Sequence, residues 1–369
     1  MGGRCSAAVQ QRGWATDAPS PSRRSLKGCL VNRSTASRLL GASLVAGAVL
    51  ALANHAAARR AERRNPPRGR FITVDGVRLH YTDRGGGPAV VLIHGNVVTG
   101  SDWEDSGLVE ALLRHHRVIA FDRPGFGHSD RPRDRIWTAE RQADLLHMAL
   151  RRLGVARPVV VGHSWGAGVA LAMAARHPQD VAGLVLLSGY YHWTLRPDVA
   201  LVAPVALPLL GDVLRYTLSP LLGRLLMPLL KRGMFGPAPV PPRFRAGFSD
   251  AMALRPSQIR AIAEDGTLMI PAALRLRRAY ARLTMPVAIL AGEGDRVVFA
   301  RNARRLHASI PGSTLRILPG VGHMLHHMAP EAVVRAVEEV SAAARPGSRL
   351  GSRPGGQPGA EMVATPRAA

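Results

Sequence analysis

The feature that most constrains the fold is an apolar run that stops at a serine between two glycines. Pro158-Val159-Val160-Val161 leads into Gly162-His163-Ser164-Trp165-Gly166, and a helical pattern begins at Ala167. Small residues two positions before and after a serine are needed where a buried strand turns sharply into a helix. Such a turn exposes the hydroxyl near helix N–H groups that favour a developing negative charge. The pattern therefore predicts that Ser164 is a nucleophile.

Short apolar or β-branched runs alternate with helical patterns on both sides of this serine. Asp75-Gly76 is a two-residue hairpin signal between the first two runs. The expected strands are 71–74, 77–81, 89–93, 117–121, 158–161, 181–187, 287–291 and 314–317, and the expected helices are 104–113, 138–153, 167–176 and 330–344. Buried strands that alternate with helices of this length predict an α/β fold, a mostly parallel sheet with helices on both faces.

The rhythm of strands is interrupted between the sixth and seventh runs. Residues 190–283 are mostly helical in pattern and rich in leucine, proline and methionine. We expect them to form a helical cap inserted into a core of residues 70–189 and 284–345. Residues 346–369 are rich in glycine, proline and arginine without apolar periodicity, and are predicted to be disordered.

An apolar stretch near the N-terminus has the length of a membrane span. Residues 39–58 are mainly alanine, leucine, valine and glycine, and about twenty residues at 1.5 Å rise cross the hydrocarbon layer. We predict a single-pass transmembrane helix between a basic, disordered region (1–38) and a basic linker (59–69). Because basic residues flank both sides, the orientation stays open.

Two other interpretations of this stretch remain. Ser22-Arg23-Arg24 resembles part of a twin-arginine export signal, and Ala51-Leu52-Ala53 fits a cleavage site, so the protein would then be exported after cleavage. The stretch also fits an uncleaved, weakly structured extension.

The charge of the chain bears on its partners. Lysine and arginine number 49 against 25 acidic residues, a net charge of +24, and only Lys27 and Lys231 are lysines. The arginines are scattered without interleaved aromatic residues or a nucleic-acid motif, so we expect no nucleic-acid partner and favour an anionic membrane surface. The two cysteines, Cys5 and Cys29, precede the globular part and do not fix the compartment.

Two further segments supply the partners that a serine nucleophile needs. A histidine must take the hydroxyl proton, and a carboxylate must orient that histidine. Asp295 follows one expected strand, in Gly292-Glu293-Gly294-Asp295, and His323 follows the next, in Gly320-Val321-Gly322-His323. Both therefore belong at the carboxyl edge of the sheet, where Ser164 also lies.

The order serine, aspartate, histidine resembles that of the α/β-hydrolases. Two loops strengthen the resemblance: His94-Gly95-Asn96 after the third strand, and Asp122-Arg123-Pro124-Gly125-Phe126-Gly127 after the fourth. The resemblance implies an eight-stranded α/β-hydrolase sheet, a cap like that of the epoxide hydrolase and haloalkane dehalogenase branch, and no metal or organic cofactor. It also implies an oxyanion hole formed by the backbone N–H groups of Asn96 and Trp165.

The candidate triad residues have competitors nearby. Glu293 and Asp122 compete with Asp295, which stands after the seventh strand as the family's acid does. His326 and His327 compete with His323, and we expect both to line the rim of the site or to face solvent. His94 and His163 are expected to be structural.

The pair Asn96 and Trp165 also resembles the halide-binding pair of haloalkane dehalogenases. Those enzymes attack with an aspartate, whose ester intermediate water cleaves at the carbonyl. Ser164 attacking an alkyl halide would leave an ether that the triad has no means to hydrolyse. Cleavage of carboxylic esters is the outcome consistent with a serine.

The cap bears on the substrate. Its leucine-rich segments, 207–210 and 221–230, either pack on the core, line an acyl pocket, or rest on a bilayer with Arg224, Lys231 and Arg232 toward phosphates. Candidate substrate-binding residues at the start of the cap are Tyr190, Tyr191 and Trp193.

The sequence thus predicts a membrane-anchored serine hydrolase that cleaves apolar, lipid-like carboxylic esters. Two alternatives stay open. One is a cofactor-free perhydrolase or acyltransferase that uses the same triad, and the other is a catalytically silent, ligand-binding member of the fold.

Overall fold

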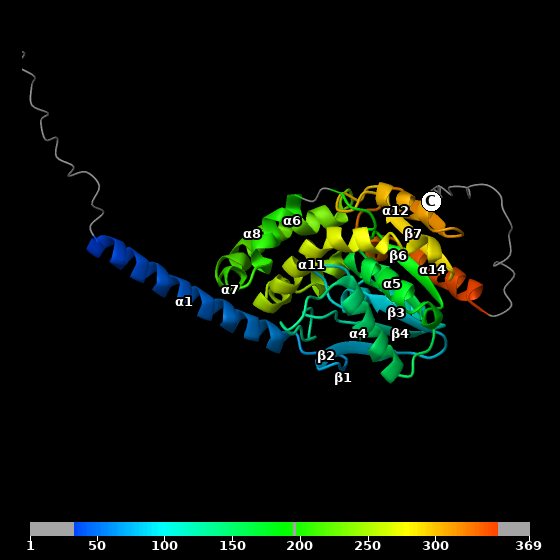
Figure 1. The fold of residues 1–369 in the computed structure, drawn as a ribbon, viewed down its shortest axis with the longest axis horizontal. Coiled ribbons are helices and arrows are strands. Elements are labelled where there is room, and N and C mark those ends of the chain that lie inside the picture. Colours follow the sequence, from blue (N-terminus) through cyan, green and yellow to red (C-terminus); the bar gives the residue numbers. More distant parts are fainter. Residues whose placement is uncertain (1–32, 195–196, 346–369) are drawn as a thin grey trace, which may run out of the picture. The chain divides into compact units, whose positions relative to one another are not determined.

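The computed structural model describes residues 33–194 and 197–345, and its centre is one eight-stranded sheet (Figure 1). The strand order is β1-β2-β4-β3-β5-β6-β7-β8. Two neighbouring pairs, β1 with β2 and β2 with β4, are antiparallel, and the other pairs are parallel. The strands are β1 (Arg70–Val74), β2 (Val77–Arg84), β3 (Ala89–Ile93), β4 (Arg117–Phe121), β5 (Val159–His163), β6 (Gly183–Leu187), β7 (Val287–Gly292) and β8 (Thr314–Leu318). The mostly parallel sheet is confirmed.

Alternate side chains of the strands enter two separate apolar clusters. On β3, Val91 and Ile93 pack into one cluster, and Val90 and Leu92 pack into the other. Helices α4 (Ala139–Arg152) and α5 (Trp165–Arg176) cover the first face, and α3 (Leu108–Leu112) and α14 (Pro330–Ala343) cover the second. Because successive residues of a strand point to opposite faces, an unbroken apolar run such as β3 requires a cover on both sides.

The helix expected at 104–113 was wrong in one respect: it is two helices. Helix α2 (Asp102–Asp105) ends before Gly107, and α3 begins after it. Gly107 has φ 82°, a left-handed conformation that interrupts a right-handed helix. Helix α5 begins at Trp165, two residues earlier than expected, so it starts directly after the serine.

Among the described residues of the segment 190–283, the regular elements are all helical. They are α6 (Pro197–Val202), α7 (Leu210–Tyr216), α8 (Leu218–Phe235), α9 (Pro242–Gly247), α10 (Asp250–Ala253) and α11 (Pro256–Leu276), with 3-10 turns at Ala203–Ala206 and Tyr280–Arg282. The chain then returns to the sheet through β7. This helical segment between β6 and β7 is the cap.

Helix α1 (Arg33–Arg64) is continuous and longer than expected. Residues 33–38, predicted to be disordered, and 59–64, predicted to be a linker, are helical. Alanine and arginine favour helix, and Arg59 and Glu62 form an ion pair of 3.5 Å one turn apart. Its part Ser37–Arg64 is long and apolar enough to cross a membrane. The compact units of the chain are 1–47 and 48–369, and the expectations for 1–32 and 346–369 lie outside the described residues.

Candidate active site

Ser164 occupies a strained turn between β5 and α5. Its backbone has φ 52° and ψ −118°, a conformation that residues with a Cβ rarely adopt. Glycines allow the close packing around it, because a Cβ on Gly162 would lie 2.5 Å from the carbonyl oxygen of Gly166, and one on Gly166 would overlap the carbonyl oxygen of Ile93. The Ser164 N–H donates to the carbonyl of Leu187 at 2.9 Å, which ties the turn to β6.

Asp295 and His323 meet at the same edge of the sheet. Asp295 follows β7, His323 follows β8, and both are buried. The Nδ1 atom of His323 lies 2.8 Å from Oδ2 of Asp295. The other carboxylate oxygen accepts hydrogen bonds from the N–H groups of Val297 and Val298, each at 2.8 Å, which fixes its orientation. With Nδ1–H donated to the carboxylate, Nε2 of His323 is left as the basic nitrogen.

The competing carboxylates are placed differently. Glu293 is exposed. Asp122 is buried, where it bonds to Nδ1 of His80 and accepts from the N–H groups of Gly100 and His128. Asp122 thus organises the loop after β4, whereas Asp295 is the carboxylate on His323.

His163 connects the serine turn to the histidine loop. Its Nε2 lies 3.0 Å from the carbonyl oxygen of His323, and the two rings are 4.8 Å apart. Burial, together with the charges of His326 and His323, holds the pKa of His163 well below its usual value, so the ring is neutral. A neutral ring donates Nε2–H to this carbonyl, which joins the segments that carry Ser164 and His323.

The turn after β3 lies directly beside the serine. A Cβ on Gly95 would be 3.0 Å from the Cβ of Ser164, so the backbone of this turn packs closely against the serine. His94 holds the turn: its Nε2 accepts the N–H of Arg123 at 2.9 Å, and its Nδ1 bonds to the carbonyl of Gly95 at 2.7 Å. Burial and the charge of Arg123 lower the pKa of His94 to about 3, so this histidine is a neutral, structural residue.

The side chains of Asn96 and Trp165 differ in their partners. The Nδ2 group of Asn96 donates to the carbonyl of Ile262 on α11 at 3.1 Å. Oδ1 of Asn96 and Nε1 of Trp165 are buried and have no hydrogen-bond partner among the described residues. One of the two N–H bonds of the Asn96 side-chain amide is therefore donated to the cap.

The three cap residues proposed for substrate binding have other contacts. The Tyr190 hydroxyl donates to the carbonyl of Thr194 at 2.7 Å, and the Tyr191 hydroxyl accepts the N–H of Gly189 at 3.1 Å. Burial raises the pKa of Tyr191 above its usual value. The side chain of Trp193 is exposed. These contacts give the tyrosines a role in shaping the start of the cap, and substrate binding by the three residues stays a prediction.

A buried charged network between core and cap was missed by the sequence analysis. The Arg123 guanidinium donates to the carbonyl oxygens of His94 and Gly95, each at 2.9 Å, and to Asp265 on α11 at 2.5 Å. Asp265 also accepts from Arg131 at 3.0 Å. Arg123 and Asp265 are fully buried, so the network fixes the turn after β3 to the cap. The sequence places Arg123 in the loop after β4, which the resemblance includes. Its partner Asp265 could not be predicted, because it lies about 140 residues away.

His326 and His327 were expected at the rim or in solvent, and this was wrong. Their side chains are 0% and 1% exposed, and their Nε2 atoms bond to the two oxygens of Asp102 at 2.6 and 2.8 Å. Burial opposes ionisation of Asp102, but the two histidines lower its pKa below the usual range. The ring of His326 also lies 4.6 Å from that of His163. His326 and His327 therefore anchor the segment that follows His323.

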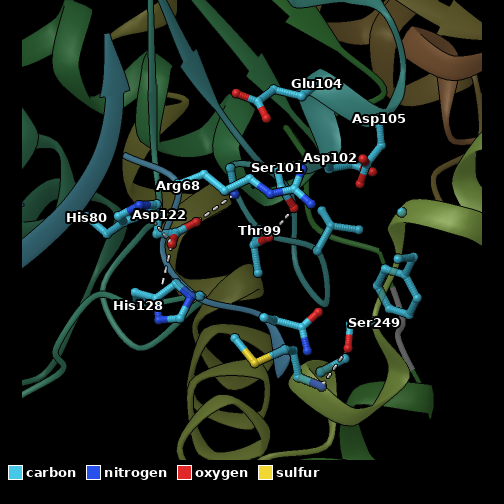
Figure 2. Close-up of a pocket in the computed structure, with 18 of the residues that line it drawn as sticks. Arg68, His80, Thr99, Ser101, Asp102, Glu104, Asp105, Asp122, His128 and Ser249 are labelled. Carbon is cyan, nitrogen blue, oxygen red and sulfur yellow. Dashed lines mark hydrogen bonds and ion pairs between the residues drawn. The ribbon is translucent and has the colours of Figure 1, made fainter. Parts of the chain in front are cut away.

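A hollow of about 220 Å³ lies beside this cluster (Figure 2). Asp102, Glu104 and Asp105 border one side, and His80, Asp122 and His128 border another. Ser164, Asp295 and His323 do not line it. Burial and the neighbouring Asp102 raise the pKa of Asp105 to about 6. The hollow, which Arg64 and Arg68 also line, is thus a charged feature separate from Ser164, Asp295 and His323.

Known proteins resemble this chain in sequence and in fold. The chain is 31% identical to an uncharacterized protein of Mycobacterium tuberculosis over 76% of this chain and 83% of that relative. It is 27% identical to haloalkane dehalogenase 2 of Mycobacterium bovis over 71% of this chain and 91% of the relative. Among solved structures, a thermophilic esterase from Thermogutta terrifontis superposes with a TM-score of 0.57 at 22% identity, over 75% of this chain and 99% of the esterase.

A family model matches most of the region that carries the sheet and the cap. The model describes the alpha/beta hydrolase fold and matches residues 88–330, which include the serine turn, the acid and the histidine. The chain therefore belongs to the α/β-hydrolase fold family and is an α/β-hydrolase enzyme.

Proposed function

We propose that this protein is a membrane-anchored serine hydrolase that cleaves carboxylic esters with an apolar acyl group. The observation that carries the proposal is the contact of 2.8 Å between His323 Nδ1 and Asp295 Oδ2, at the sheet edge where Ser164 occupies its strained turn. The serine distinguishes this site from the aspartate nucleophile that the dehalogenase branch uses.

The reaction follows from the roles of these groups. His323 takes the hydroxyl proton through Nε2 while Ser164 Oγ attacks the acyl carbonyl, and the Asp295 carboxylate stabilises the imidazolium that forms. The backbone N–H groups of Asn96 and Trp165 donate hydrogen bonds that stabilise the negative charge developing on the carbonyl oxygen. His323 then gives its proton to the departing alcohol, and water repeats the same steps on the acyl enzyme.

Apolar surroundings support an apolar acyl group. A cluster of Val98, Met234, Phe235, Phe244 and Met324 joins the loop after β3, the end of α8 and the loop of His323. Met324 follows the catalytic histidine directly, and Val98 lies two residues from Asn96. This cluster places hydrocarbon beside the loops that carry Asn96 and His323, which suits an apolar acyl group.

Helix α1 supports the anchor, because Ser37–Arg64 has the length and composition of a span. Carbonate extraction of membranes tests it: the anchor predicts that the full-length protein stays in the membrane pellet. A shortened protein in the soluble fraction would contradict the anchor and favour a cleaved export signal.

Hydrolysis of a graded ester series, from acetyl to palmitoyl, tests the catalytic proposal on the full-length protein in detergent. We expect turnover that rises with acyl length and disappears in Ser164→Ala. Turnover that Ser164→Ala retains, or no turnover of any ester by the folded wild type, would contradict it. Product analysis with methanol or hydrogen peroxide present separates hydrolysis from acyl transfer, because a transferase or perhydrolase forms the methyl ester or the peracid in preference to the free acid.

A further inference from the structure

The leucines of α8 form a stripe on the outside of the molecule. They recur every three or four residues, as on one face of a helix, and each is exposed, with Leu225 reaching 76%. The stripe consists of Leu218, Leu221, Leu222, Leu225, Leu226, Leu229 and Leu230. Monomeric soluble proteins rarely expose a contiguous apolar surface of this kind.

The opposite face of α8 supplies the packing of the helix. Pro220, Met227, Met234 and Phe235 are buried there. The stripe is therefore not the face that packs on the core, which was one of the three interpretations of these leucines. Lys231, expected near phosphates, instead forms an ion pair with Asp250, whereas Arg232 is exposed at the end of the stripe.

The helices before α8 extend the apolar surface. Val199–Ala206 and Leu210–Tyr216 meet at 106°, and together they have the length and composition of a bent span. Leu201, Leu207, Leu209 and Val213 are exposed on this stretch. The outward apolar surface thus runs over α6, α7 and α8, which Figure 1 shows together at the end of the fold away from α14.

The anchor helix fixes where this surface lies relative to a bilayer. The side chain of Asn54 on α1 donates to the carbonyl oxygens of Tyr216 and Thr217, at 2.8 and 3.0 Å, where α7 ends and α8 begins. Asn54 precedes Arg59 by five residues, about 7.5 Å along a helix axis. If Arg59 marks the boundary of the span, the start of α8 lies at the depth of the headgroups and upper acyl chains, about 5–10 Å into the bilayer, where interfacial helices bury their apolar faces.

The other end of α8 reaches the active site. The carbonyl oxygen of Met234 accepts the N–H of His323 at 3.0 Å and that of Met324 at 3.3 Å. Helix α8 therefore connects the place where Asn54 meets the cap to the loop that carries His323.

We infer that the leucine stripe of α8 is a lipid-docking surface, which lies in the upper acyl region of the bilayer and admits ester substrates from the membrane to Ser164. The inference rests on the membrane anchor of the proposed function. It commits to lipid as the occupant because α1 ties the stripe to the span through Asn54, and because the exposed Arg232 suits lipid phosphates.

Lipid contact can be measured site by site in the full-length protein reconstituted into phosphatidylcholine and phosphatidylglycerol vesicles. Single cysteines are introduced by Leu225→Cys, Val45→Cys and Glu338→Cys after Cys5→Ser and Cys29→Ser, and carry an environment-sensitive fluorophore. Val45 lies within the expected span and Glu338 is exposed on α14. We expect the probes at positions 225 and 45 to shift to the blue and to be quenched by lipids brominated on the acyl chain, and the probe at 338 to do neither.

The outcomes separate the two proposals. Quenching at 45 without quenching at 225 would overturn the docking surface and leave the anchor. Quenching at 225 without quenching at 45 would overturn the anchor and support docking through the cap alone. A blue shift at 225 that brominated lipid does not quench, and that dilution of the protein abolishes, would show a second copy of the chain on the stripe and overturn lipid docking.

Substrate entry has its own test. Leu225→Ser with Leu229→Ser is expected to lower turnover of a long-chain ester held in vesicles about tenfold, and to leave turnover of a water-soluble acetyl ester unchanged. Ile136→Ser, at an apolar residue of the core that is 68% exposed, as Leu229 is, is expected to alter neither. An equal loss on both esters, or no loss on the vesicle-held ester, would overturn entry from the membrane.

Discussion

The catalytic core and the outer part of the cap use apolar residues in opposite ways. The central strands β3, β5 and β6 bury their valines and leucines, on both faces of the sheet. Helix α8 of the cap exposes seven leucines and buries mainly methionine, proline and phenylalanine. The comparison shows that the seven leucines of α8 do not serve to hold the cap on the core, so they are available to another partner.

Charge helps to hold the two regions together. Arg123 and Arg131 of the core meet Asp265 of α11 in a buried network, and Arg123 also bonds to the turn beside Ser164. The cap is thus attached at the active site by ion pairs while its apolar surface faces outward.

The largest expected effect concerns the catalytic edge of the core. Asp295→Asn is expected to lower ester turnover about 10⁴-fold, because an amide at this position favours the wrong tautomer of His323. Glu293→Gln, two residues away and exposed, is the matched control and should stay within about twofold, as surface changes away from the reacting groups do. Similar losses in both variants, measured as kcat/KM on one ester, would mean that Asp295 is not the orienting acid.

The second largest effect is expected where the cap is attached to the core. Asp265→Ala is expected to lower the free energy of unfolding by about 3–5 kcal/mol, because Arg123 keeps its buried charge without a carboxylate to balance it. Urea unfolding in detergent measures this effect. Asp134→Ala, which removes an exposed partner of Arg135, should cause no measurable change. Equal unfolding midpoints for the two variants would refute the importance of the buried network.

The two faces of α8 can be compared directly. Met227→Ala removes a buried side chain and is expected to cost about 2–3 kcal/mol of stability in detergent. Leu225→Ala, on the stripe, should change stability by less than about 0.5 kcal/mol. A reversed order in thermal or urea unfolding would show that the stripe packs inside the protein.

A smaller effect is expected from pH at the border between core and cap. The pKa of Asp105 is raised to about 6 from 3.8, so the protonated form contributes stability that is fully present below pH 3.8 and is lost as the pH rises through 6. Because the residue is partly exposed, we expect the loss to be about 1–2 kcal/mol between pH 4 and pH 7. Unfolding of the wild type and Asp105→Asn across this range checks it, and parallel pH curves for the two proteins would contradict it.

The sequence was most informative where the chemistry is local. The glycines around Ser164 and the alternation of apolar runs are sufficient to predict the turn, the parallel sheet and the positions of Asp295 and His323, because backbone geometry and strand period set them within a few residues. The partition of 104–113 into two helices depended on the positive φ of Gly107, which a glycine permits but does not require.

Long-range polar contacts could not be predicted in the same way. The hydrogen bonds of Asp102 to His326 and His327 join residues more than 200 positions apart. No motif in either segment indicates that the two segments meet. The environment of the leucine face of α8 was also left open. An amphipathic pattern predicts that leucines share one face of a helix, but it does not tell whether protein, lipid or water contacts that face.

Labelling with a fluorophosphonate tests the central claim most directly, because the probe reacts with a serine only when a histidine and an oxyanion hole activate it. The account predicts that the full-length protein is labelled, that peptide mapping finds the adduct on Ser164, and that Ser164→Ala and His323→Ala are not labelled. A folded wild type that resists the probe, or an adduct that survives in Ser164→Ala, would contradict the assignment of this protein as a serine hydrolase.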